Sequence, residues 1–384
     1  MQSVAAKYEF RLKNQAGVVQ ARFGDWVSLN CTKIVNDVGS FEITFYDNDD
    51  ARFASFVVDG QVEVWRSVPG CSLDWYREFE GFYRSMKRET SEKGDKLITF
   101  SGFDYNHLLA RRVIGYRQGT VYAEKDDYVE DCMKEYVNEN AGPGASAASR
   151  LRNGVFTNFT VEALSASHDD TGEWVGERSF QNLLEVLQQL SDYSWFLTPV
   201  TRSVDFAVVN NGAGNFIFRT YLDQLGTDRS VLSANPTIFS IELGNLTNVM
   251  YALERSKEIN AIMVLGKGEG ATRKVRARTN AVDGADSPWN DIEVARAATL
   301  NEYLSQLDAF GDSTLQENRY TETIDGTPLQ IAGCLYGEHY FLGDKVTFGY
   351  EGMEIDKQVS KVTIEIGERQ KNEKISIEFK DIEW

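Results

Sequence analysis

The sequence predicts an α+β fold built mainly from β-strands. Short runs of alternating apolar and polar residues, separated by Gly, Asn and Asp, fill residues 1–116 and return after residue 237. Between these regions, and again near 290–312, the apolar spacing becomes that of amphipathic helices. The chain has 384 residues, of which 42% are hydrophobic and 26% charged, which is typical of a globular protein with two or three domains.

Residues 1–116 are expected to form a barrel or a sandwich. Seven candidate strands follow one another at short intervals, with a hairpin tip expected at residues 92–95 and a short helical closure at His107–Ala110. The candidate strands are YEFRLKN, GVVQARF, WVSLNCTKIV, SFEITFY, SFVVDGQVEVWR, REFEGFYRSMKRET and KLITFSGF.

Residues 117–236 are expected to form an α+β insertion. The first helix is indicated by apolar residues at helical spacing, namely Tyr128, Val129, Cys132, Met133, Tyr136 and Val137. It should stop at the breaker cluster 140–144, and residues 141–150 are linker-like in composition. A second helix is predicted from Ser179 as its N-cap, with a buried face of Phe180, Leu183, Leu184, Leu187 and Leu190. Three strands, SWFLTPVT, SVDFAVVNN and NFIFRTYL, should follow.

Residues 237–384 return to strands and are expected to hold one helical insert near 290–312. That helix is predicted over 291–310, with Ile292, Ala295, Leu300, Tyr303, Leu304, Leu307 and Phe310 on its buried face. The candidate strands are TIFSIELGN, NVMYALERS, AIMVLGKG, RKVRART, DKVTFGYEG, KQVSKVTIEIGE and KISIEFKDIEW. In the last of these, charges alternate with Ile, as in a half-buried antiparallel sheet.

The sequence offers little catalytic chemistry. His107, His168 and His339 are far apart, and there is no G-x-S-x-G motif. Cys31, Cys71, Cys132 and Cys334 form no C-x-x-C pair, so reduced, mostly buried thiols are expected. Residues 266–270 could be taken for a phosphate loop, but a strand follows rather than a helix, which favours a glycine-rich turn. We therefore predict no catalytic, cofactor or metal site.

Several short motifs follow one another in order along the chain. The first is the turn-and-strand of residues 36–45, with Asn36, Gly39 and Phe41. Phe79-Glu80-Gly81 follows, and then residues 98–112 with Gly102 and Asp104. Late in the chain come 265–270, with Gly268 and Gly270, and 340–346, with Gly343 and Asp344. This ordered set resembles the tail-tip hub proteins of siphophages, a family with tube-like barrels, and these residues are predicted to be structural positions.

The resemblance implies two tube-type β-barrel domains, 1–116 and 237–384, joined by inserted α/β elements. It also implies a homotrimer in the virion, assembled in the host cytoplasm, which closes the tail tube and forms part of the DNA ejection channel. Its expected partners are a tail tube or distal tail protein, a tape-measure protein, and a fibre or tip protein. No signal peptide or membrane span is apparent.

The net charge of −18 argues against binding nucleic acid by neutralising phosphates. It fits simple solubility, or a channel wall that repels double-stranded DNA and lets it slide. Two other functions stay open at this point. One is a cell-wall hydrolase or peptidase that uses some of the many carboxylates. The other is a carbohydrate-binding adhesin that uses exposed tryptophans.

Overall fold

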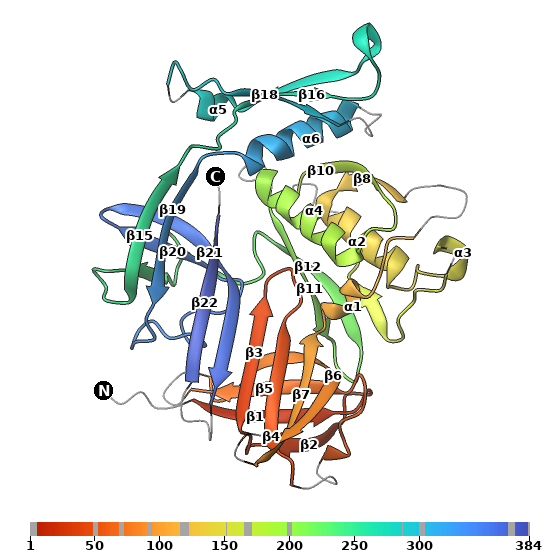
Figure 1. Ribbon diagram of the computed structural model, residues 1–384, viewed down its shortest axis with the longest axis vertical. Helices are drawn as coiled ribbons and strands as arrows, with labels where there is room; N and C mark the ends of the chain where they lie inside the picture. Colours follow the sequence, from red (N-terminus) through yellow and green to blue (C-terminus); the bar gives the residue numbers. More distant parts are fainter. Residues whose placement is uncertain are drawn as a thin grey trace.

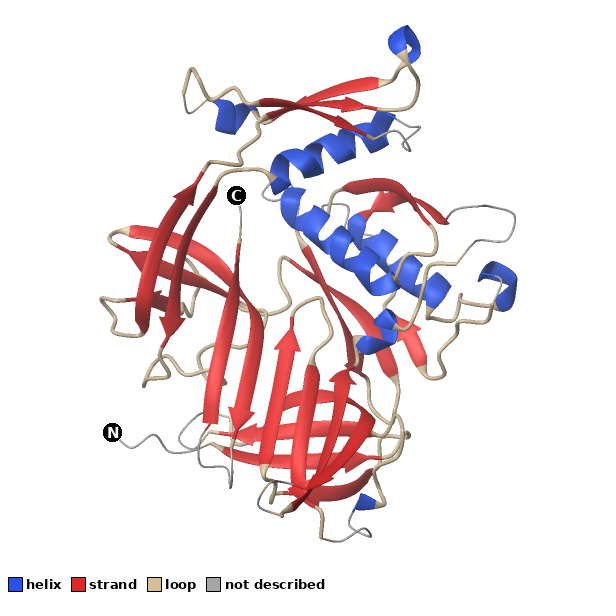
Figure 2. Ribbon diagram, viewed as in Figure 1, coloured by secondary structure: helices blue, strands red, loops and turns tan. Residues whose placement is uncertain are grey.

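The computed structural model describes most of the chain, and Figure 1 shows its arrangement: a large sheet region, a helix-containing insertion beside it, and a small lobe at the far end. The described residues are 6–48, 53–68, 73–90, 92, 94–115, 123–150, 152–164, 171–197, 202–285, 287–298, 304–367 and 373–382. Strands dominate the fold and helices are few, as Figure 2 shows, so the mainly β prediction is confirmed.

The first part of the chain forms a strongly curved antiparallel sheet in the strand order β3-β4-β7-β6-β5-β1-β2. A flat sheet would hold β1 and β4, four steps apart, about 19 Å from each other. Instead the rings of Phe10 on β1 and Phe41 on β4 lie 5.8 Å apart, and Phe23 on β2 lies 5.1 Å from Phe45 on β4. The sheet therefore curls over an aromatic core. Its strands are β1 (Lys7–Lys13), β2 (Val19–Phe23), β3 (Ser28–Ile34), β4 (Ser40–Tyr46), β5 (Gln61–Ser67), β6 (Tyr76–Thr90) and β7 (Lys96–Asp104).

The last strands of the chain extend this same sheet. β21 (Met353–Ile366) pairs along β3, from Lys361 opposite Ile34 to Ile366 opposite Leu29. β20 (Lys345–Tyr350) and β22 (Glu373–Asp381) flank β21, and the short strands β13 (Asp228–Arg229) and β14 (Ile238–Ser240) pair with β20. One twelve-stranded sheet thus joins both ends of the chain. Within the described ranges, its backbone pairing does not close into a ring.

The insertion has its own apolar core. A two-stranded sheet and a three-stranded sheet pack with helices α2 and α4, whose buried faces meet. The elements are β8 (Ala123–Tyr128), α2 (Val129–Asn140), α3 (Ala147–Arg150), β9 (Phe159–Val161), β10 (Glu173–Arg178), α4 (Leu183–Leu197), β11 (Val204–Asn210) and β12 (Phe216–Leu222). Phe82 of β6 and Tyr105, just before α1 (His107–Ala110), reach into this core and fix the insertion to the first sheet.

A small lobe stands at the end of a two-stranded ribbon. The ribbon pairs β15 (Leu246–Glu254) with β19 (Thr321–Pro328). The lobe consists of β16 (Ala261–Leu265), η2 (Gly270–Thr272), β17 (Val275–Thr279), α5 (Ala281–Gly284), β18 (Glu293–Ala297) and α6 (Leu304–Glu317). Its core lies between α6 and the sheet β17-β16-β18.

Three predictions of local structure are wrong in detail. Within the helix predicted over 291–310, residues 293–297 instead form a strand that pairs in parallel with β16, and Ala295 lies on that strand; the described helix covers Leu304–Glu317. Residues 194–197 of the predicted strand SWFLTPVT instead complete α4. Phe180 is 57% exposed with φ 56°, and Asn182 accepts the amide N–H of Leu184, so the cap lies later than Ser179.

Of the other expectations for local structure, one is confirmed, one is wrong, and some concern residues outside the described ranges. The first predicted helix is confirmed as α2. Residues 141–150 are packed rather than linker-like, since Ala141 and Ala145 are fully buried and Arg150 donates to the carbonyl of Val113 at 2.6 Å. Leu300 and Tyr303 lie outside the described residues. The proposed domain limits at 116 and 236 stay predictions.

Candidate functional site

The most constrained polar site lies where the two ends of the chain meet the insertion. We call Asn36, Asp104, Asn106, Asp205 and Gln358 the junction cluster. They come from the β3–β4 loop, the end of β7, the turn before α1, β11 and β21 respectively. The cluster therefore holds together segments that are far apart in sequence.

Asn36 ties the first sheet to the insertion. Its backbone is left-handed, with φ 58°, a conformation that asparagine tolerates better than most residues. Its side-chain amide donates to Ser191 Oγ at 2.8 Å and to Asp205 Oδ1 at 2.6 Å, and its Oδ1 accepts the N–H of Phe206 at 2.8 Å. One side chain thus contacts both α4 and β11.

Asp205 is fully buried and accepts four hydrogen bonds. Oδ1 accepts from Asn36 and from Trp195 Nε1 at 3.2 Å. Oδ2 accepts from Gln358 Nε2 at 2.6 Å and from the N–H of Leu225 at 2.8 Å. Burial raises the pKa of this carboxyl, while the four donors oppose the rise by stabilising the anion.

Asp104 and Asn106 bind the β3–β4 loop at the same junction, and Asn106 also binds β11. Asp104 accepts the N–H groups of Gly39 at 2.8 Å and Asn106 at 3.1 Å, and burial raises its pKa to about 8. Asn106 donates to the carbonyl of Asp37 and accepts the N–H of Val208, both through its side chain. A Cβ on Gly39 would lie 2.5 Å from the carbonyl oxygen of Thr32, so the turn excludes a larger residue.

Asp344 makes a second junction, between β20 and the segment that leaves the insertion. Oδ1 accepts the N–H of Thr227 at 2.7 Å, and Oδ2 accepts from Arg229 Nε at 2.8 Å and from the N–H of Phe341 at 2.9 Å. Gly343 has φ 86° and its carbonyl accepts the N–H of Gly226, a conformation that glycine allows at low cost. Burial raises the pKa of Asp344.

The remaining predicted glycines lie in strand pairs and turns, and Gly81 is the register partner of Asp104 in the junction cluster. A Cβ on Gly102 would lie 1.8 Å from the carbonyl oxygen of Phe82 and 2.8 Å from the ring of Phe41, so β6 and β7 approach too closely for any side chain there. Gly81 is restricted in the same way by the carbonyl of Phe103. Gly268 and Gly270 lie in the β16–β17 turn with φ 107° and 53°, so residues 266–270 form a turn between strands, as predicted.

A buried network connects β5 to the end of the chain. Arg66, 3% exposed, donates through Nε to Tyr8 Oη and Glu373 Oε1, both at 2.8 Å. Through Nη1 it donates to Tyr76 Oη at 2.7 Å and to the carbonyl of Tyr336 at 3.0 Å. A single guanidinium thereby fastens the first strand of the chain, the loop before β20 and the start of β22 to one another.

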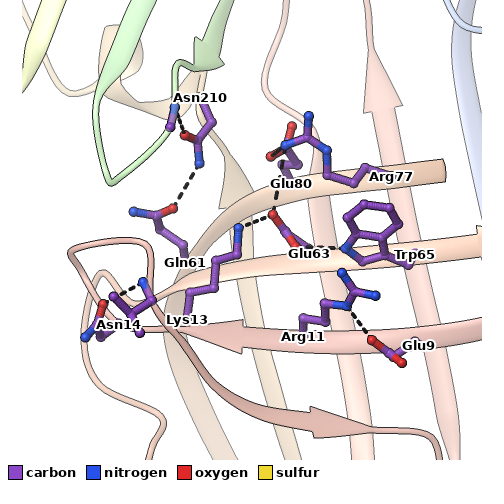
Figure 3. A network of polar contacts seen from close by, with 12 residues as sticks. Glu9, Arg11, Lys13, Asn14, Gln61, Glu63, Trp65, Arg77, Glu80 and Asn210 are labelled. Atoms are coloured by element: carbon purple, nitrogen blue, oxygen red, sulfur yellow. Dashed lines mark hydrogen bonds and ion pairs between the residues drawn. The ribbon is translucent and has the colours of Figure 1, made fainter. Parts of the chain in front are cut away.

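The outer face of β1, β5 and β6 carries the charged network drawn in Figure 3. Glu63 accepts from Trp65 Nε1 at 2.8 Å and pairs with Lys13. Arg77 donates to Glu80 at 2.6 Å, and the guanidinium of Arg11 stacks 4.1 Å from the ring of Trp65. Three acidic residues (the third is Glu9) thus face three basic ones, so this face is electrically balanced rather than acidic.

A cavity of about 240 Å³ lies beside the junction cluster. Lys33, Glu78, Glu80, Asp104 and Phe206 line part of it. Glu78 is buried, and its Oε2 has no hydrogen-bond partner among the described residues. The other oxygen, Oε1, pairs with Lys33 and accepts from Tyr336 Oη at 2.8 Å.

The two described histidines make different contacts. His107 contacts Arg111, His339 accepts the N–H of Leu335, and His168 lies outside the described residues. In the part of the chain that is described, no group of three His, Cys, Asp or Glu side chains could hold a metal ion, and no helix is long and apolar enough to cross a bilayer. Cys31, Cys132 and Cys334 are buried free thiols, as predicted, and Cys71 lies outside the described residues.

The tryptophans do not gather into one described sugar platform. Trp26 and Trp174 are buried, while Trp65 and Trp195 are half-buried and donate their indole N–H groups to Glu63 and Asp205. The exposed Trp75 precedes β6, and Trp289 precedes β18 in the distant lobe.

Comparison of the sequence with known protein families gives one match over nearly the whole chain. The sequence profile of the siphovirus ReqiPepy6 Gp37-like proteins matches residues 9–379, nearly the whole chain. The chain belongs to that family. The resemblance to siphophage tail proteins inferred from the ordered motifs is therefore confirmed. The family is one of structural proteins of the phage tail. No protein with a curated description matches the sequence significantly.

Solved structures agree on the fold. The 43 kDa tail protein of prophage MuSo2 from Shewanella oneidensis is similar with a TM-score of 0.55 and 12% identity, over 98% of this chain and 99% of that one. A tail protein from Neisseria meningitidis MC58 gives a TM-score of 0.53 at 12% identity, over 97% and 96%. Prophage tail protein gp18 from Listeria monocytogenes EGD-e gives 0.51 at 10% identity, over 97% and 94%.

Of the five residues in the junction cluster, the resemblance identified two, Asn36 and Asp104. It also identified Gly39 beside them and Gly343 and Asp344 at the second junction. Asn106, Asp205 and Gln358 were missed, as was Arg66 of the buried network. A lone carboxylate within the otherwise apolar run of β11 was the available signal for Asp205, because a buried charge requires partners.

Proposed function

We propose that this chain is a structural subunit of the hub at the tip of a phage tail and assembles as a homotrimer. In this role it closes the tail tube, and its strand-rich ends serve as tube-type barrels that line part of the path for DNA. The expected neighbours are a tail tube or distal tail protein, a tape-measure protein, and a fibre or tip protein.

One observation carries the proposal: both strand-rich ends share a single sheet, locked to the insertion by the junction cluster. A subunit that must bear the load of a tube needs its barrel elements in a fixed mutual orientation. Buried, fully partnered polar groups supply such orientation better than apolar contacts, because they have few alternative arrangements. Family membership and the fold shared with other tail proteins support the same role.

The proposal is tested by the mass and symmetry of the assembled protein. Mass photometry of the purified chain should give three times 43.3 kDa, and cryo-electron microscopy of tails should place the chain in a ring with threefold symmetry at the tip. Subunit interfaces should bury more than about 2,000 Å² in total, as obligate assemblies do. A stable monomer that is absent from the tails would refute the proposal.

The charge of the channel gives a second test. In the assembled ring, acidic residues should outnumber basic ones along the path of DNA, because a negative wall repels phosphates at short range. Lysine substitutions at those channel-facing acidic positions should slow DNA ejection, and the slowing should weaken as salt is raised. The balanced face of Figure 3 is expected to lie away from the path.

A further inference from the structure

The lobe at the end of the ribbon presents an uncovered apolar sheet face. In the sheet β17-β16-β18, alternate residues point to opposite sides. Ile262 and Val264 of β16 are buried in the lobe core. Arg276 and Arg278 of β17 form bidentate ion pairs with Asp308 and Asp312 on α6, which places their side of the sheet against that helix.

The opposite side is defined by the strand register. Thr279, Ala261 and Glu293 form one row across the three strands, and Ala277, Met263 and Ala295 form the next. Val275, Leu265 and Ala297 form the third row. We call these nine residues the lobe face.

Seven of the nine residues are apolar, and the central Met263 is 44% exposed. Figure 1 shows α6 beneath this sheet, and no element of the described chain covers the other side. By contrast, the outer face of β1, β5 and β6 carries a network of charged and polar side chains (Figure 3). In a chain of net charge −18, this uncovered sheet face is a place where another polypeptide can bury apolar area.

We propose that the lobe face docks one amphipathic α-helix of another tail polypeptide. Three strands spaced about 4.8 Å apart span roughly 10 Å, which is the diameter of one helix. Five residues of strand extend about 16 Å, the length of about three helical turns. The alanines Ala261, Ala277 and Ala295 let a helix approach closely.

The size of the lobe face argues against a second copy of this chain as its occupant. An area of about 16 by 10 Å is far below the roughly 800 Å² per partner that a stable protein pair needs. A single helix can use so small a surface when its polypeptide is held in the same assembly, since the effective concentration is then high. This inference therefore rests on the proposed function in the tail.

Charge at the two ends of the lobe face sets the direction of the helix. The β16–β17 turn carries Lys267, Arg273 and Lys274 against Glu269, whereas Asp291 and Glu293 lie at the other end. The negative end of the helix dipole, its C-terminus, should lie at the basic turn, and its N-terminus at the acidic end.

The experiment compares the free chain with the chain in tails. Hydrogen peroxide should oxidise Met263 in the free chain. In tails its oxidation should fall at least tenfold, toward that of the fully buried Met133. A photo-crosslinking amino acid in place of Ala277 should then join, in tails, to a segment of a different protein whose apolar residues recur at i, i+3, i+4 and i+7.

A matched pair of variants tests the contact itself. M263E places a carboxylate at the centre of the lobe face and should reduce the Ala277 crosslink roughly tenfold, because a buried unpaired charge opposes docking. M250E changes a methionine of similar exposure on β15 and should leave the crosslink unchanged. Both positions are exposed, so both variants should fold.

The outcomes separate this inference from the proposed function. If the chain is absent from tails, the proposed function fails. If it is present but Met263 is as reactive as in the free chain, or Ala277 crosslinks to a second copy of this chain, the helix inference is overturned and the hub proposal stands.

Discussion

Asp205→Asn is the substitution that most directly tests the junction cluster. It preserves the shape of the side chain but turns one carboxylate oxygen, an acceptor, into an amide donor. Whichever oxygen is replaced, two of the four donors around Asp205 lose their acceptor. Hydrogen bonds to a charged group contribute about 1.5–3 kcal/mol each, so the gross loss is about 3–6 kcal/mol.

Removing a buried charge recovers part of that loss, since the carboxylate no longer has to be desolvated. We therefore expect the local opening free energy to fall by about 3 kcal/mol, the low end of that range. At 1.36 kcal/mol per tenfold change, amide hydrogen exchange around Leu225, whose N–H donates to Asp205, should become about 100-fold faster.

Hydrogen-exchange mass spectrometry of the two variants measures this. The matched control is Asp223→Asn, which removes one end of an exposed ion pair with Arg202 in the same region. Exposed pairs contribute about 0–1 kcal/mol, so exchange in the control should change by less than about fivefold. Equal exchange rates in D205N and D223N would show that Asp205 does not hold the junction.

Three further outcomes follow from the same geometry. Gly102→Ala should lower the denaturation midpoint strongly or prevent folding, because the new Cβ would lie 1.8 Å from a backbone carbonyl oxygen. In the control Gly24→Ala the new Cβ has no atom within 4 Å, so this variant should be neutral or slightly stabilising. Burial and neighbouring arginines lower the pKa of His107 to about 4, below its unfolded value near 6.5. The stability that neutral His107 contributes is therefore complete above pH 6.5 and is lost as the pH falls toward 4. In denaturant titrations, H107Q should flatten this loss of stability at low pH. Arg66→Met should lower the free energy of unfolding by about 3–5 kcal/mol in chemical denaturation, because it leaves buried partners without a donor. The control Arg77→Met, at an exposed ion pair, should lower it by less than about 1 kcal/mol. Equal denaturation midpoints for the two variants would contradict this account.

The strands were the most predictable part of the fold. Alternation of apolar and polar residues is a local property, and β4 shows it well: Phe41, Ile43 and Phe45 all point into the core. The helix α2 was equally predictable, because its apolar residues recur at helical spacing and are all buried: Val129, Cys132, Met133, Tyr136 and Val137.

Where the prediction was wrong, a distant partner decided the structure. Residues 293–297 have alanine-rich spacing that suits a helix, but parallel pairing with β16, some thirty residues earlier, makes them a strand. The junction cluster shows the same limit. A charge within β11 signals a buried partner, yet nothing near Asp205 indicates that the partner is Gln358, 153 positions away.

The shared sheet also depends on a long-range contact, the pairing of β3 with β21. Thr32 and Thr363 contact each other across 331 positions of sequence, so the shared sheet is complete only when nearly the whole described chain is present. Closing so long a loop costs entropy, although the cost grows only with the logarithm of its length, and an insertion that folds on its own core shortens the effective loop. Until β21 pairs, β3 exposes an open edge next to a large aromatic core, which is an aggregation hazard. In the folded chain, Asn36, directly after β3, and Gln358, on β21, both bind the carboxylate of Asp205 in the insertion, so the junction cluster stabilises the pairing that covers this edge. Both ends of the shared sheet therefore depend on one carboxylate that the insertion supplies.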